Sequence, residues 1–63
     1  MEIPETILFC AEILRETEKA YLVNDGAQSV WIPKSQITSM VYTGKIDYDF
    51  TIPGWLASKN NLI

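Results

Sequence analysis

The sequence predicts a mainly β protein: a small five-stranded antiparallel barrel with a short C-terminal helical turn. Short apolar runs alternate with turn residues along the chain. Pro33 and Pro53 each stop a run of β-forming residues, because proline has no N–H to donate to a sheet. Residues 1–63 are expected to form one domain, and a chain this short offers no second layer to cover a flat sheet. Rolling the sheet into a barrel would bury its apolar face.

The first segment, residues 3–14, is compatible with two structures. A helix beginning near Pro4 would be amphipathic and would pack across a four-stranded barrel. A strand is favoured because the following residues look like a hairpin. The strand divides the segment into two faces, with Ile7, Phe9, Ala11 and Ile13 on one and Leu8, Cys10, Glu12 and Leu14 on the other.

The next two strands are expected on either side of a tight turn. A polar break at 15–19 precedes the β-forming run 20–23. Asp25-Gly26 is the strongest turn signal in the chain, because glycine reaches the positive φ angles that a hairpin needs. The third strand, 30–32, runs into Pro33, and residues 34–36 then predict a one-turn corner.

The last part of the chain is expected to hold two strands and the helical turn. The fourth strand covers 37–42 and ends at the turn 43–45. A period of two then predicts a fifth strand with one buried and one wet face, Ile46, Tyr48, Phe50 and Ile52 against Asp47, Asp49 and Thr51. After Pro53, residues 54–59 are expected to form a helical turn that lays Trp55 and Leu56 over an open barrel end.

Charge and cysteine content bound the class of protein. Five basic and eight acidic residues give a net charge of −3, which disfavours non-specific electrostatic binding to nucleic acid or an anionic membrane. Cys10 is the single cysteine, so the chain has no internal disulfide and a reducing compartment is the simpler inference. Neither a signal-peptide pattern nor a membrane-length apolar run is present, so a cytoplasmic protein is expected.

The residue types leave little room for catalysis. The sequence has no histidine, and one cysteine cannot build a zinc site. Its three glycines are isolated, so no phosphate-binding loop is formed. Asp47 and Asp49 would lie about 7 Å apart on one strand face, a separation that some hydrolases use, but a charged solvated face is the favoured interpretation. We expect no enzyme activity, no cofactor and no metal.

Binding is therefore the favoured class of function. Trp31 would be exposed if Val30 and Ile32 face the core, and buried if they do not; both alternatives stay open. Exposed tryptophan is enriched at interaction hot spots. The candidate surface for a partner protein comprises Trp31, Tyr42, Asp47 and Asp49. The alternative is single-stranded nucleic acid, with bases stacked on Trp31 and phosphates held by Lys19, Lys34 and Lys45.

Two resemblances add to this picture. The block from Trp31 to Ile37 resembles the corner of SH3 domains, where a strand passes through a 3₁₀ turn into the last strand. Gln36 replaces that family's groove tyrosine, so the resemblance implies local geometry and not proline-rich peptide binding. The barrel is accordingly expected to be SH3-like or OB-like. The blocks 16–23, 30–37 and 52–59 resemble short proteins of unknown function from bacteriophages and other mobile elements. This second resemblance implies a phage or prophage origin and a non-enzymatic accessory role, to which protein binding, inhibition or homo-oligomer formation would be suited.

Overall fold

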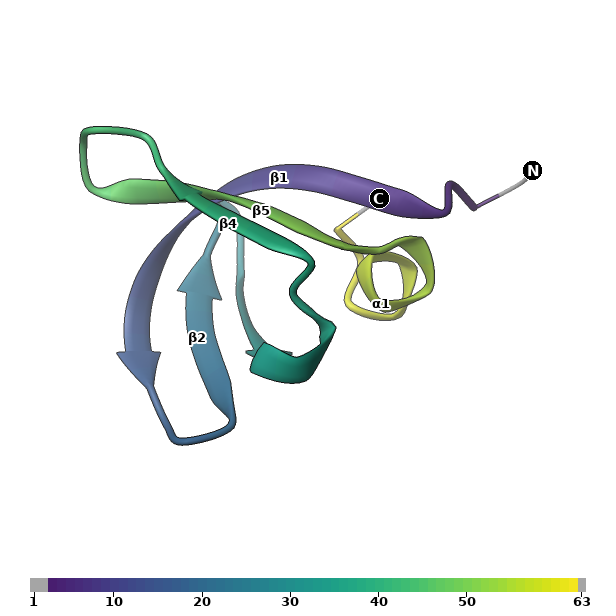
Figure 1. Ribbon diagram of the computed structural model, residues 1–63, viewed down its shortest axis with the longest axis horizontal. Coiled ribbons are helices and arrows are strands. Elements are labelled where there is room, and N and C mark those ends of the chain that lie inside the picture. The colour runs from purple at the N-terminus through teal and green to yellow at the C-terminus, as the bar shows by residue number, and fades with distance from the viewer. Residues whose placement is uncertain (1–2, 63) are drawn as a thin grey trace.

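The computed structural model describes residues 3–62 and contains a five-stranded antiparallel sheet followed by a short helix (Figure 1). The strand expected within residues 3–14 is confirmed, and the helix alternative is wrong. The elements in chain order are β1 (Thr6–Glu16), β2 (Ala20–Asn24), β3 (Ser29–Pro33), the 3₁₀ turn η1 (Lys34–Gln36), β4 (Ser39–Tyr42), β5 (Asp47–Pro53) and α1 (Gly54–Lys59).

The long strand β1 holds two halves of the sheet together. The spatial order is β3-β2-β1-β5-β4. Residues Thr6 to Glu12 of β1 pair with β5, and Glu12 to Glu16 pair with β2. Figure 1 shows β1 bending from the β5 half into the β2 half, so that the sheet curves around its own inner face.

The inner face of the sheet carries the core. Phe50 on β5 is fully buried and stacks on Phe9 of β1, with ring centroids 5.5 Å apart. Buried side chains from both halves and from α1 meet there: Ala11, Val23, Ile32, Phe50, Ile52, Leu56 and Ala57. Of the two faces of β1, the one that carries Ile7, Phe9, Ala11 and Ile13 is therefore the inner one. We call the opposite face of the sheet the outer face.

Strands β3 and β4 form the two edges of the sheet. The pairings run from β3 to β4 without a return ladder between those two strands in the described part of the chain. The antiparallel five-stranded sheet is thus as expected. Closure into a barrel stays a prediction, because the sheet formed by residues 3–62 is not closed by hydrogen bonds.

The corner after Pro33 has the geometry that the sequence indicates. Pro33 is extended, with φ −62° and ψ 131°, and η1 begins at the next residue. The Lys34 N–H donates to the Lys19 carbonyl at 2.8 Å, which ties this corner to the β1–β2 turn. The fourth strand begins at Ser39 and not at Ile37.

The helix α1 packs on the sheet through a close backbone approach. A Cβ built on Gly54 would lie 1.7 Å from the Pro4 carbonyl oxygen, and the Gly54 N–H donates to the Glu5 carbonyl at 2.9 Å. Only glycine fits this approach. Leu56 is buried as expected, but the expectation that Trp55 covers the core is wrong, since it is 54% exposed. Neighbouring helical residues point about 100° apart, so turning Leu56 inward turns Trp55 outward.

A second correction concerns the start of the fifth strand. Ile46 was expected on its buried face, yet it is 70% exposed and precedes β5, which begins at Asp47. The turn 43–46 takes up this residue. Within β5 the expected alternation is present, with Phe50 and Ile52 buried and Asp49 and Thr51 partly exposed on the outer face.

Candidate interaction surfaces

Trp31 lies exposed on the outer face of the edge strand β3. Its neighbour Ile32 is fully buried, so strand alternation turns Trp31 outward, where it is 46% exposed. Trp31 pairs with Leu22 of β2, and Leu22 in turn pairs with Arg15 of β1. The structure thus selects the exposed alternative for Trp31 and places Leu22 and Arg15 in one row beside it.

A β-bulge in β1 enlarges this row. The pairing of β1 with β2 shifts between Ile13 and Arg15, so that Leu14 is the additional residue. Leu14 follows Glu12 in outward alternation and is 46% exposed, while Arg15 lies opposite the outward Leu22. We call this group the Trp31 surface; it comprises Leu14, Arg15, Leu22 and Trp31. Tryptophan and arginine are residue types enriched at protein interfaces.

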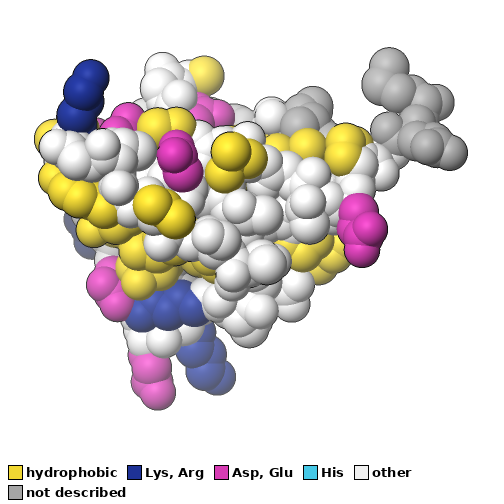
Figure 2. All heavy atoms as spheres, turned by 45° about the horizontal axis from the view of Figure 1, so that its top comes forward, with side chains coloured by type: hydrophobic (Ala, Val, Ile, Leu, Met, Phe, Trp, Pro, Cys, Tyr) yellow, Lys and Arg dark blue, Asp and Glu magenta, His cyan; other side chains and the backbone are white. Residues whose placement is uncertain are grey.

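Three carboxylates gather on the outer face of the other half of the sheet. Glu12 of β1 lies directly opposite Asp47 of β5, and Asp49 follows two residues later on the same face. We call these three residues the acidic surface. Exposed Leu8 and Val41 lie on the same face, and Figure 2 shows hydrophobic side chains interspersed with acidic ones on the side of the molecule in view.

Asp47 has structural partners, whereas Asp49 is the less constrained carboxylate. Thr43 Oγ1 donates to Asp47 Oδ1 at 2.7 Å, and Cys10 Sγ donates to Asp47 Oδ2 at 3.0 Å. These two hydrogen bonds hold the pKa of Asp47 below its usual value. The thiol responds in the opposite sense, because the bond to Asp47 and the nearby negative charges raise the pKa of Cys10 to about 11. Cys10 is therefore a poor nucleophile at neutral pH.

Tyr42 lies apart from both surfaces. It pairs with Tyr48 on the inner side of the sheet, with ring centroids 5.2 Å apart, and its hydroxyl donates to the Lys45 carbonyl. Tyr42 is nevertheless 55% exposed, at the end of the edge strand β4.

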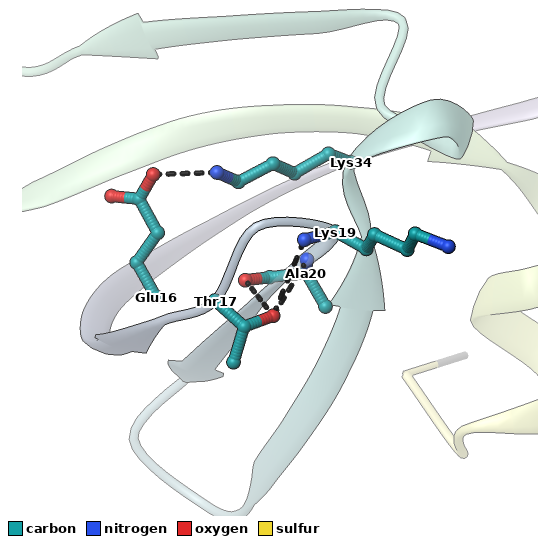
Figure 3. A network of polar contacts seen from close by, with 5 residues as sticks. All are labelled: Glu16, Thr17, Lys19, Ala20 and Lys34. Carbon is teal, nitrogen blue, oxygen red and sulfur yellow. Dashed lines mark hydrogen bonds and ion pairs between the residues drawn. The ribbon is translucent and has the colours of Figure 1, made fainter.

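Two of the three candidate lysines come together beside the β1–β2 turn. Lys19 and Lys34 line one pocket of about 450 Å³ with Glu18, Pro33 and Ser35. Lys34 Nζ donates a hydrogen bond to Glu16 Oε2 at 2.5 Å and lies 4.8 Å from the centre of the Tyr21 ring. The bond to Glu16 is the main cause that raises the pKa of Lys34. In Figure 3 Lys19 points away from this ion pair. Lys45 belongs to the β4–β5 turn and does not join them.

The predicted partner residues are therefore divided among three places. Trp31 is on β3 and Tyr42 on β4, at opposite edges of the sheet, while Asp47 and Asp49 lie between them on β5. Sequence reasoning missed Leu14, Arg15 and Leu22 as companions of Trp31. The change from apolar Leu14 to charged Arg15 could have indicated an irregularity in the strand. A bulge, however, depends on how β1 pairs with β2, and the pattern within one strand does not reveal that pairing.

Within residues 3–62 we find no cluster of three or more histidine, cysteine or carboxylate residues that could hold a metal ion, and no helix long and apolar enough to cross a membrane. Comparison of the chain with models of protein families, with curated proteins and with solved structures finds no match.

Proposed function

We propose that this chain is a small non-enzymatic accessory protein of the phage type that acts by binding another protein. The observation that carries the proposal is the Trp31 surface. An exposed tryptophan lies in one row with Leu22 and Arg15, and a bulge adds Leu14 beside them. Such a side-chain set offers a partner apolar area and an arginine donor on a rigid sheet.

The acidic surface supports a basic partner. Glu12 and Asp47 are opposite each other on one face of the sheet, an arrangement that destabilises a sheet through like-charge repulsion. A basic protein surface would relieve that repulsion and would be steered toward the negative half of the molecule. The Trp31 surface then supplies affinity and the acidic surface supplies the rate of association.

The test is capture of a partner from bacterial lysate by tagged protein, after nuclease treatment. Trp31→Ala is expected to reduce the captured band at least tenfold. Trp55→Ala is the matched control, because Trp55 is also about half exposed but lies on α1. Equal loss with both variants, or with neither, would contradict the Trp31 surface as the contact.

The role of the acidic surface is tested with Asp49→Lys, because Asp49 has fewer structural contacts than Asp47. Its control is Glu5→Lys, which makes the same charge change at an exposed residue just before β1, five positions in sequence from Cys10, the residue that pairs with Asp49. We expect Asp49→Lys to slow association and Glu5→Lys to leave it unchanged, as measured by biolayer interferometry with the captured protein.

A second candidate function is binding of single-stranded nucleic acid. It is favoured by the pocket that Lys19 and Lys34 line, since Pro33 in that pocket shares the outer face of β3 with Trp31. Bases would stack on Trp31 while Lys19 holds a phosphate. Titration with a labelled oligonucleotide at about 50 mM salt tests it, because phosphate contacts are strong under that condition. Binding that Lys19→Glu abolishes would support this candidate; a flat titration would end it.

A further inference from the structure

The two edges of the sheet differ in how they are protected against pairing. Edge strands of natural sheets usually carry proline or a charged residue that prevents another strand from adding to them. β3 ends in Pro33 and is followed by Lys34. β4, Ser39–Tyr42, contains neither proline nor a charged residue, and β5 is its partner in the described sheet.

The hydrogen-bonding side of each β4 residue follows from one bond at the end of the strand. The Thr43 N–H donates to the Asp47 carbonyl on β5 at 3.1 Å. Backbone groups alternate in direction along a strand, so Ser39 and Val41 also turn their amides toward β5. The N–H and C=O groups of Met40 and Tyr42 then point away from β5, to the open edge.

We propose that a second copy of this chain pairs antiparallel with β4 across a two-fold axis at Val41. In this register Met40 of one copy lies opposite Tyr42 of the other, and the two residues exchange both N–H···O bonds. The symmetry repeats the exchange, which gives four main-chain hydrogen bonds. The two Val41 residues meet at the axis as a non-hydrogen-bonded pair, with Cα atoms about 4.5 Å apart.

The side chains favour a second copy over an unrelated strand. Val41 is 57% exposed on the outer face, and its copy would cover it at the axis. On the inner face the Met40 thioether would reach the Tyr42 ring of the other copy, a favourable sulfur–aromatic contact. Because β4 has no charged residue, the pairing brings no like charges into contact despite the net charge of −3.

Pairing of two copies would also add buried surface to a protein whose own core is small. Seven of the described residues form the buried hydrophobic cluster, and chains near 60 residues bury only about 60% of their unfolded surface. The dimer would extend the sheet from five strands to ten and leave both Trp31 surfaces free at its outer ends. The proposal is thus independent of partner binding through Trp31.

The first experiment places a disulfide at the axis. In a Cys10→Ser background, Val41→Cys is expected to form a covalent dimer under mild oxidation, doubling the mass of 7.2 kDa on a non-reducing gel. The expected Cα separation falls within the range that disulfides accept. Leu8→Cys is the control, because Leu8 is 68% exposed on the same face but belongs to β1 at the centre of the sheet.

The second experiment measures reversible association by analytical ultracentrifugation from about 5 μM to 1 mM protein. The unmodified chain is expected to move from monomer to dimer, and Val41→Lys to remain monomeric because two ammonium groups would meet at the axis. Leu8→Lys should still dimerise. A monomer at all concentrations, a dimer that Val41→Lys leaves intact, or equal oxidation of Leu8→Cys and Val41→Cys would each overturn the proposal.

Discussion

Cys10 and Asp47, 37 residues apart in the chain, are joined on the outer face of the sheet by a hydrogen bond of 3.0 Å from the thiol to the carboxylate. The bond holds the proton on sulfur and raises the pKa of Cys10 to about 11. We therefore predict that Cys10 reacts with iodoacetamide at pH 8 on the order of 100-fold more slowly in the folded protein than in urea, although the residue is exposed.

Replacing Asp47 tests this assignment. Asp47→Asn removes the negative charge while it keeps an oxygen acceptor, so the thiol pKa should fall and alkylation should accelerate by roughly tenfold or more. Asp49→Asn is the comparison, because Asp49 contributes less to the shift than Asp47. The assignment would be wrong if both variants accelerated the reaction equally.

Acid should weaken the β2–β3 turn through Asp25. Its Oδ1 accepts hydrogen bonds from the N–H groups of Ala27 and Gln28, both at 2.9 Å, and these bonds lower the pKa of Asp25. A carboxyl with a lower pKa in the folded state than in the unfolded state stabilises the fold above the unfolded value and loses this contribution as the pH falls through the folded value. We predict a lower urea midpoint at pH 2.5 than at pH 7.

The variant Asp25→Asn separates this contribution from that of the other carboxyls. It cannot titrate, so the difference in urea midpoint between pH 7 and pH 2.5 should shrink relative to the unmodified chain. Glu18→Gln is the matched control, since Glu18 is an exposed carboxyl in the neighbouring turn. An equal difference in all three proteins would show that the Asp25 bonds do not stabilise the turn.

Gly54 is the position where one added methyl group should cost most. In Gly54→Ala the new Cβ would meet the Pro4 carbonyl oxygen, which belongs to the backbone and cannot turn aside. We predict a loss of about 3 kcal/mol, the upper end for overpacking, out of the roughly 3–5 kcal/mol that a core of this size supplies. Lys59→Ala, exposed on the same helix, should leave the thermal midpoint unchanged; a similar midpoint for both variants would contradict the close approach.

Local patterns sufficed for the strands but not for the surfaces. The alternation in β5 and the turn at Asp25-Gly26 depend on neighbouring residues, so both could be predicted from the sequence. Pro33 likewise predicted the corner into η1. The exposure of Trp31 depended on whether Ile32 took the core position, which the sequence left open, and that of Trp55 depended on Leu56, for which the prediction was wrong. The separation of Trp31 from Tyr42 at opposite edges of the sheet follows from the order β3-β2-β1-β5-β4, in which β1 pairs with the distant strand β5.

The bulge at Leu14 gives the sharpest test of the sheet register. Deleting Leu14 would leave Ile13 opposite Val23 and Arg15 opposite Leu22, so that the same pairs form one regular ladder. We predict that this variant folds, with a loss of about 1–2 kcal/mol because the strand bends less around the core without its bulge. Far-UV circular dichroism tests whether the variant folds, and urea unfolding measures its loss of stability.

Deleting Leu8 from the regular part of β1 is the matched control. It would shift every pair with β5 on one side of the deletion by one residue and would turn the inward Ile7 to the outer face. That variant should unfold, because its apolar residues can no longer all face Phe50. If both deletions unfolded the chain, Leu14 would be an integral member of the ladder; if both folded, the β1–β5 register would not be fixed by its buried face.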